Sequence, residues 1–201
     1  MQAESEYCVA ITGASGAAYG LALVRTLARL GRTVHLVVSE GGARVLRHEC
    51  DIALSPKAPD PSLLIPDDPQ AASRVVPHAV ANYGASIASG SYPLGGMAVC
   101  PCSMGTLGRI AAGTAENLVT RAADVCLKER RSLVLVPRET PLSLIHLENM
   151  ARLTRAGAVM LPANPGFYQR PATIDELVHF IVARVLDQWG IAHDVQEPWR
   201  G

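Results

Sequence analysis

Cationic side chains that could bind an anion are concentrated in one segment of the chain, residues 120 to 139. The chain as a whole carries 18 Lys and Arg against 18 Asp and Glu, so the excess of positive charge in this segment is local. Clustered cationic donors are typical of a site for a small anion with several negative oxygens, most often a phosphate. We therefore expect the chain to handle phosphorylated small molecules. The charged residues of the segment include Arg121, Lys128, Arg130, Arg131, Arg138 and Glu139.

A second candidate for phosphate binding is the stretch Thr12-Gly-Ala-Ser-Gly16, which follows an apolar run. Its small residues let the backbone turn sharply and present N–H groups at the start of a helix, and Ser15 adds a hydroxyl. The alternative is a tight strand-to-helix turn without a ligand. The glycine spacing departs from the G-x-G-x-x-G pattern of dinucleotide sites, which disfavours an NAD site.

Two further loops are rich in hydroxyl groups and glycine. Ser89-Gly-Ser91 precedes an apolar run that we expect to be a strand, and Cys102-Ser-Met-Gly-Thr106 follows that run. Each loop alone is ordinary. Together with residues 12–16 and the cationic segment, they predict a single crevice that holds a mononucleotide by its phosphate and the edge of its ring.

Two glutamates are candidate proton carriers, and two other side chains are candidate ligands of a phosphorylated molecule. Glu49 and Glu139 suit proton transfer, although most glutamates are solvated surface charges. Arg184 lies on the apolar stripe of the predicted last helix, where the alternative is a guanidinium that extends along the helix surface. Tyr168 lies in a proline-bounded loop, where its phenol could reach a ligand or could be structural.

Short apolar runs alternate with longer helical patterns along the chain, and these elements must position the side chains above. The runs lack polar alternation, as expected of parallel strands covered on both faces. We predict one α/β domain over residues 1–201, a doubly wound Rossmann or flavodoxin-like parallel sheet flanked by helices, with ligands at the carboxyl ends of the strands. The predicted strands span residues 7–12, 33–38, 97–100, 132–136 and 158–161, and the predicted helices span residues 17–30, 41–47, 117–128, 143–155 and 173–189.

The segment between residues 55 and 73 is rich in proline. Proline at this density is incompatible with a regular helix or a central strand. We expect a surface excursion there, with a subunit contact as one possible role.

Composition argues against several classes of partner. The net charge is zero, so the broad basic face that duplex nucleic acid requires is absent. The N-terminus is polar and acidic, unlike a secretory signal, and no apolar stretch approaches the roughly 18 residues of a membrane span, so we expect a cytoplasmic protein that does not enter a membrane. The five cysteines favour buried thiols over disulfides, and neither they nor the histidines have the spacing of metal ligands.

Motifs over nearly the whole chain resemble, in order, those of the UbiX-type flavin prenyltransferases, formerly described as 3-octaprenyl-4-hydroxybenzoate carboxy-lyase partner proteins. The run from residue 120 to residue 150 is the most specific part of the resemblance. The motifs are Thr12-Gly-Ala-Ser-Gly16, Ser89-Gly-Ser91, Cys100-Pro-Cys-Ser103, Thr120-Arg-Ala-Ala-Asp124, Leu127-Lys-Glu-Arg-Arg131, Pro137-Arg-Glu139, His146-Leu-Glu-Asn-Met150 and Pro165-Gly-Phe-Tyr168.

The resemblance implies a homo-oligomer, typically a dodecamer, that joins the dimethylallyl group of dimethylallyl phosphate to N5 and C6 of reduced FMN without a metal. The product, prenylated FMN, would serve UbiD-type decarboxylases. The implied catalytic residues are Ser15, Glu49, Lys128, Arg138, Glu139, Tyr168 and Arg184. The expected cofactor-binding residues, from the resemblance and the three loops together, are Gly13, Ala14, Ser15, Ser39, Ser89, Ser91, Ser103, Met104, Thr106 and Arg121.

The chain departs from the family pattern after Ser39, where it has Glu40-Gly-Gly42 and relatives often have a lysine and small alanines. The proline-rich segment matches no family motif. Tyr83 and Trp199 are candidates for aromatic walls of the prenyl pocket, on position alone.

Two other functions stay open. One is an FMN-dependent cysteine-type decarboxylase of the same fold, which uses a histidine in the first helix region. The helix predicted over residues 17–30 contains no histidine, which argues against this function. The other is a non-catalytic flavin carrier.

Overall fold

A six-stranded sheet with all strands parallel forms the centre of the computed structural model, which describes residues 6–197. The strand order is β3-β2-β1-β4-β5-β6. The strands are β1 (Glu6–Ile11), β2 (Val34–Val38), β3 (Val75–His78), β4 (Leu94–Cys102), β5 (Ser132–Pro137) and β6 (Val159–Met160). The helices are α1 (Ala17–Arg29), α2 (Glu40–Cys50), α3 (Pro69–Ala72), α4 (Met104–Ala112), α5 (Leu118–Lys128), α6 (Leu144–Arg155) and α7 (Ile174–Gln188), and two 3-10 turns are η1 (Pro61–Leu63) and η2 (Ser86–Ala88).

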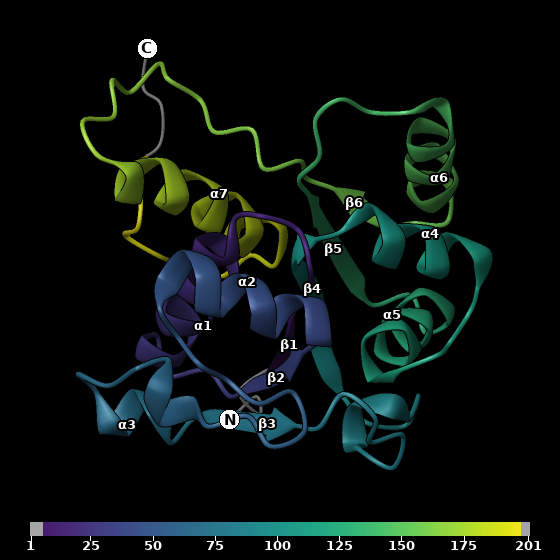
Figure 1. Cartoon of the computed structure of the whole chain (residues 1–201), viewed down its shortest axis with the longest axis horizontal. Coiled ribbons are helices and arrows are strands. Elements are labelled where there is room, and N and C mark those ends of the chain that lie inside the picture. Colours follow the sequence, from purple (N-terminus) through teal and green to yellow (C-terminus); the bar gives the residue numbers. More distant parts are fainter. Residues whose placement is uncertain (1–5, 198–201) are drawn as a thin grey trace.

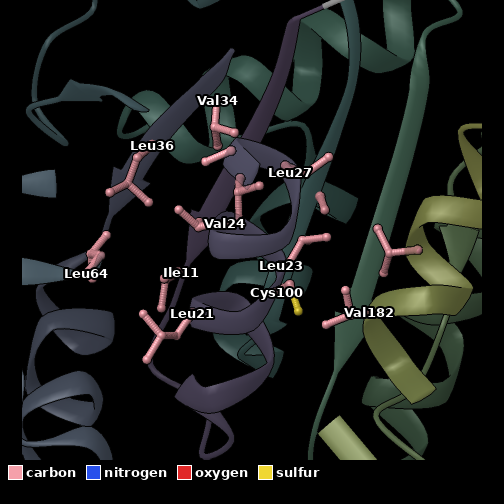
Figure 2. Packing of buried hydrophobic residues seen from close by; sticks show 14 of the residues in the cluster. Ile11, Leu21, Leu23, Val24, Leu27, Val34, Leu36, Leu64, Cys100 and Val182 are labelled. Atoms are coloured by element: carbon pink, nitrogen blue, oxygen red, sulfur yellow. The ribbon is translucent and has the colours of Figure 1, made fainter. Parts of the chain in front are cut away.

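Helices cover both faces of the sheet, as predicted. Helices α1, α2 and α7 lie on one side and α4, α5 and α6 on the other (Figure 1). The strands are apolar at successive positions because each face needs its own core: Val9 and Ile11 pack under α1, whereas Cys8 and Ala10 belong to the opposite core. Figure 2 shows the first of these cores. The doubly wound α/β fold is confirmed.

A glycine sets how closely α1 lies on the sheet. A Cβ atom added at Gly20 would lie 2.1 Å from the backbone oxygen of Cys100, a distance that no side chain tolerates. Glycine therefore lets the helix backbone rest directly on β4. This contact places the N-terminus of α1 beside the carboxyl ends of β1 and β4.

The sequence patterns missed β3 and α4 and shortened β4. Strand β3 contains Pro77, which is tolerated because β3 is at the edge of the sheet and pairs with β2 alone. Strand β4 runs from Leu94 to Cys102, so it begins before the predicted residue 97 and includes Gly96. A side chain at Gly96 would collide with the ring of Trp189, which stacks on Tyr7 with ring centroids 4.7 Å apart.

The segment between residues 55 and 73 lies largely at the surface, as predicted, but some of its residues reach the core. Leu64 and Ile65 are fully buried in the core shared with α1, and the Arg25 side chain donates a hydrogen bond of 2.7 Å to the Leu64 backbone oxygen. Prolines start both short helical turns of the segment, after the capping residues Asp60 and Asp68. The segment therefore carries a piece of the core and leads the chain into β3.

No helix among residues 6–197 is long and apolar enough to cross a membrane. Within the same range, no group of three or more His, Cys, Asp or Glu side chains is placed to hold a metal ion. All five cysteines are free thiols.

Candidate functional site

The strand order reverses between β1 and β4, which is where ligands bind in doubly wound sheets, beyond the carboxyl ends of the strands. The loop of Gly13 and Ser15 follows β1, and Ser103 follows β4. Thr12 ties the two loops together, because its buried hydroxyl donates to the Pro101 oxygen and accepts from the Ser103 N–H, both at 2.8 Å. The sequence gives no signal for this role of Thr12, because threonine is common at strand ends and its partners are distant in the chain.

The start of α2 packs against the loop after β1. Ser39 caps α2 by accepting a hydrogen bond of 3.0 Å from the Gly42 N–H. A Cβ atom at Gly42 would lie 2.2 Å from the Ile11 oxygen, and one at Gly41 would lie 2.9 Å from the Gly13 Cα. The Gly-Gly pair that departs from the family pattern thus permits a close backbone contact and leaves Ser39 at the switch point.

Glu49, near the end of α2, binds the beginning of α1. One of its carboxylate oxygens accepts hydrogen bonds from the Gly16 and Ala17 N–H groups, at 2.8 and 2.9 Å. Burial alone would raise the pKa of Glu49, but hydrogen bonds from the Ser15 hydroxyl and these two N–H groups, together with the charge of Arg138, lower it overall. Glu49 is therefore a stable carboxylate beside Ser15, and the α1 dipole favours that charge.

Arg138 extends from the end of β5 over the loop after β1. Its Nε donates a hydrogen bond of 3.2 Å to the Ser15 backbone oxygen. Glu139, the next residue, is exposed and accepts from the Thr140 N–H at 3.2 Å. The structure thus brings together Ser15, Glu49 and Arg138, three of the predicted catalytic residues, from β1, α2 and β5.

Ser103 caps α4 and positions Thr106. The Ser103 hydroxyl accepts from the Thr106 N–H at 3.3 Å and donates to the Thr106 hydroxyl at 3.0 Å. The side chain of Met104 is buried in the core, so its backbone is the part that a ligand could contact. Gly13 and Ser15 are exposed, whereas Ala14 is buried.

Ser89, Ser91 and Lys128 lie at the opposite edge of the sheet. Ser89 and Ser91 precede β4, and Lys128 precedes β5, so all three are at the amino ends of these strands. Arg131, close to these residues, donates a hydrogen bond of 2.6 Å to the Gly90 backbone oxygen. Lys128 forms a short ion pair with Glu129. The prediction that the three loops and the cationic segment line one crevice of one chain is therefore wrong, because α5 carries Lys128 across the sheet.

Arg121 lies on the first turn of α5. Its Nε donates to the Ala88 oxygen at 3.1 Å, and its Nη1 pairs with Asp124 at 3.2 Å. The guanidinium thereby links α5 to the crossover that contains η2 and leads to Ser89. Tyr83, in the same crossover, is half-exposed, and Trp199 lies outside the described residues.

Tyr168 and Arg184 share a third location. They line a pocket of about 440 Å³ between the loop before α7, the last turns of α7 and the segment that follows it. The Tyr168 ring packs edge-on against Phe180, with centroids 5.9 Å apart. Arg184 is half-exposed and pairs with Asp187 at 2.8 Å.

The fold and the switch-point residues define the class of the chain: a doubly wound α/β protein with a mononucleotide-type site. The family model described as Flavoprotein matches residues 1–186. The flavin prenyltransferase UbiX of Halalkalibacterium halodurans is 50% identical over 195 residues, which is 96% of this chain and 92% of that protein. The chain belongs to the Flavoprotein family and, within it, to the UbiX-type flavin prenyltransferases.

Solved structures agree with this assignment. AnUbiX (PadA1) in complex with FMN and dimethylallyl pyrophosphate is 40% identical, has a TM-score of 0.88, and the match covers 99% of both chains. A dodecameric FMN-dependent UbiX-like decarboxylase from Escherichia coli O157:H7 is 44% identical with a TM-score of 0.83, over 98% of this chain and 99% of the other. The cysteine decarboxylase TvaF, at 16% identity and a TM-score of 0.59 over 94% and 99% of the chains, shares the fold alone.

Proposed function

We propose that this chain joins the dimethylallyl group of dimethylallyl phosphate to N5 and C6 of reduced FMN, with prenylated FMN and phosphate as products. The observation that carries the proposal is the convergence of Ser15, Glu49 and Arg138 at the switch point, held by the contacts described above. The membership of the chain in the UbiX-type flavin prenyltransferases supports the same reaction. The cysteine-type decarboxylase is less well supported, since helix α1 contains no histidine.

The residues at the carboxyl edge fit a mononucleotide. Helices α1, α2 and α4 all begin at this edge, and the N-terminus of a helix favours anions. Ser39 and Ser103 add hydroxyl groups there, and exposed Gly13 lets a ligand approach the backbone closely. We assign FMN to this edge, with Gly13, Ala14, Ser15, Ser39, Ser103, Met104 and Thr106 as its contacts within one chain.

The remaining predicted cofactor-binding residues and Lys128 reach the same ligand only from other copies of the chain. Ser89, Ser91 and Lys128 lie at the amino edge, and Arg121 lies beside η2. A large apolar surface is available for assembly, since Leu142, Leu144, Ile145 and Leu147 at the start of α6 are 42–70% exposed. Apolar surface of this kind marks a protein contact. A homo-oligomer, with the dodecamer of the related UbiX-like decarboxylase as the expected form, therefore completes the site.

The chemical demand on the site is the departure of phosphate from an allylic carbon. The C–O bond breaks, both bonding electrons leave with the phosphate, and preorganised cationic donors stabilise the charge that develops there. We assign this role to Arg138 together with Lys128 and Arg184, with the Tyr168 hydroxyl as a neutral donor. The carbon then forms its bond to N5, which loses its proton. A proton added to the prenyl double bond and the loss of the proton on C6 accompany the closing bond to C6.

Proton transfer falls to the groups around N5. Glu49 is an ionised carboxylate in contact with Ser15, so it can accept a proton through that hydroxyl. Glu139 and the released phosphate are further acceptors at the same edge. We infer that prenylated FMN passes to a UbiD-type decarboxylase and that the chain works in the cytoplasm, where its five free thiols stay reduced.

The test of this assignment is the substitution Arg138→Ala, with Arg109→Ala as the control. Arg109 is half-exposed, pairs with Glu116 and lies at the end of α4 away from the switch point. We expect R138A to lower kcat/KM for dimethylallyl phosphate about 100-fold, as for loss of one transition-state donor, and R109A to leave it unchanged. Equal kinetics for R138A and R109A would remove Arg138 from the mechanism.

A further inference from the structure

Three polar side chains form a hydrogen-bonded chain at the end of α7 and in the segment that follows it, and the family resemblance does not imply this chain. Arg184 Nη1 donates to Asp187 Oδ2 at 2.8 Å, and His193 Nε2 lies 3.2 Å from Asp187 Oδ1. Each oxygen of one carboxylate thus holds a different neighbour. Arg184 and Asp187 are on α7, whereas His193 belongs to the segment that follows the helix.

The buried end of this chain is His193. Only 8% of its side chain is exposed, compared with 50% for Arg184 and 40% for Asp187. An exposed Arg–Asp pair on one helix is weakly ordered by itself, because solvent competes for both charges. The buried imidazole gives the Asp187 carboxylate a fixed partner and therefore a defined orientation.

The Asp187 carboxylate also defines the role of one ring nitrogen of His193. A carboxylate only accepts, so Nε2 is the donor of this hydrogen bond. Nδ1 is buried and has no hydrogen-bond partner within residues 6–197. The hydrogen bond of the ring within these residues is therefore the one from Nε2 to Asp187, and Asp187 in turn pairs with Arg184.

All three side chains line the pocket of about 440 Å³ that also contains Tyr168. The segment after α7 borders the pocket, and the Gln169 side chain ties it to the loop before α7 by a hydrogen bond of 2.9 Å to the Glu197 backbone oxygen. A cavity of this size accepts a small phosphorylated ligand. Arg184 uses Nη1 for Asp187, which leaves its other N–H donors available to phosphate oxygens.

We propose that Asp187 and His193 are positioning residues for Arg184: His193 orients the Asp187 carboxylate, and Asp187 holds the guanidinium in the orientation that binds the phosphate of the prenyl donor. The inference rests on the proposed function, because it takes Arg184 as a phosphate ligand. A guanidinium held in place loses less rotational freedom when it binds, so binding is tighter. If Asp187 instead only neutralised Arg184, its removal would strengthen phosphate binding.

The test measures binding of inorganic phosphate and of dimethylallyl phosphate to the intact oligomer by calorimetry, with kcat and KM measured in parallel. We expect Asp187→Ala to raise both dissociation constants about tenfold, as for loss of a charge-assisted hydrogen bond. Asp187→Asn, which keeps the shape and one acceptor oxygen, serves if D187A does not fold, and a smaller rise is expected for it. Unchanged or tighter phosphate binding by the folded variants would overturn the proposal.

His193 is tested by a pair of variants and a control. We expect His193→Ala to weaken phosphate binding and His193→Gln to restore it, because the amide nitrogen of glutamine can take the place of Nε2 beside Asp187. FMN affinity is expected to stay unchanged in both. Glu116→Ala removes the carboxylate of another exposed Arg pair, Arg109 with Glu116, and should bind phosphate as the wild type does. Equal binding by H193A and H193Q would remove His193 from the proposal.

The outcome separates this inference from the proposed function. If the wild type formed no prenylated flavin, the proposed function would fail, and phosphate calorimetry on D187A would still decide the role of Asp187. If the wild type formed the product and Arg184→Ala did not, but D187A matched the wild type, the positioning role alone would be wrong.

Discussion

Glu49 joins the end of α2 to the first N–H groups of α1, so it should stabilise the fold as well as move protons. We expect Glu49→Ala to lower the free energy of unfolding by about 1 kcal/mol, the usual value of a helix cap. Glu49→Gln, which keeps an acceptor oxygen but loses the charge, should lose less. Urea unfolding of the two variants measures the difference, and equal stability of E49A and the wild type would contradict the capping role.

The contribution of Glu49 to stability should depend on pH in a defined direction. Its pKa is lower in the folded protein than the usual 4.5, so the folded state favours the ionised form. The contribution is therefore complete above pH of about 4.5 and disappears as the pH falls through the folded-state pKa. The stability difference between wild type and E49Q, followed by thermal unfolding, should shrink on acidification below that pH and stay constant above it.

At the scale of residues, the sequence predicted the positions of Ser15 and Arg138 better than the position of Lys128. The loop of Ser15 and the position of Arg138 follow from local pattern, because strands β1 and β5 end at the same edge. Lys128 was misplaced, since its distance from that edge depends on the direction of α5. Asp187 and His193 were missed because a common i,i+3 pair and a lone histidine carry no signal until the segment after α7 folds back.

The contact between α1 and β4 depends on Gly20, as the 2.1 Å approach to Cys100 indicates. We expect Gly20→Ala to destabilise the protein by about 2 kcal/mol or more, because overpacking forces the helix off the sheet. Gly105→Ala is the matched control: Gly105 is also in a helix, and its nearest neighbour would be 3.7 Å away. G105A should be neutral or more stable by up to about 1 kcal/mol. Similar midpoints in urea for G20A and G105A would contradict the packing argument.

A polar cluster joins β2 to the edge strand β3 away from the switch point between β1 and β4. His35 Nδ1 lies 2.8 Å from His78 Nε2, and His35 Nε2 lies 2.7 Å from Glu6, which also binds the Tyr92 hydroxyl. Burial, and then the charge of the neighbouring His35, lower the pKa of His78 to about 4. His78 is therefore neutral in the folded protein at neutral pH.

This cluster predicts an acid-sensitive sheet edge. The pKa of an ordinary histidine is 6.5, so between pH 6.5 and about 4 the unfolded chain binds a proton at His78 more readily than the folded chain does. Stability should fall over that range as the pH is lowered. His78→Gln should flatten this part of the profile, whereas substitution of exposed His179 should not. Parallel profiles for H78Q and the wild type would contradict the prediction.

At the scale of elements, periodicity identified the strands that are central and the helices that are long. It missed β3, where Pro77 is compatible only with an edge position that the sequence does not reveal. It predicted the surface position of residues 55–73 but not their anchor in the core, because proline density indicates irregular backbone and not the burial of Leu64. Both omissions have one cause: the tertiary neighbours decide what an irregular segment does.

At the scale of the whole molecule, the site should be shared between copies of the chain, and mixed oligomers test this. Lys128→Ala and Arg138→Ala should each be nearly inactive, because each removes one of the proposed phosphate donors. The two residues lie at opposite edges of one chain, so one site takes them from two copies. When the two variants are dissociated and reassembled together, some sites take Arg138 from a K128A copy and Lys128 from an R138A copy. These sites contain both residues and are intact. Random mixing predicts about a quarter of the wild-type activity in a closed symmetric oligomer. No recovery in oligomers shown to be mixed would contradict a shared site.

The most direct test of the account is the mass of the flavin after anaerobic incubation of the protein with reduced FMN and dimethylallyl phosphate. We predict a flavin heavier than FMN by one five-carbon prenyl unit, together with one released phosphate. Unmodified FMN that stays bound would indicate a flavin carrier, and unmodified FMN accompanied by decarboxylation of a cysteine-type substrate would indicate a decarboxylase. Either result would contradict the account.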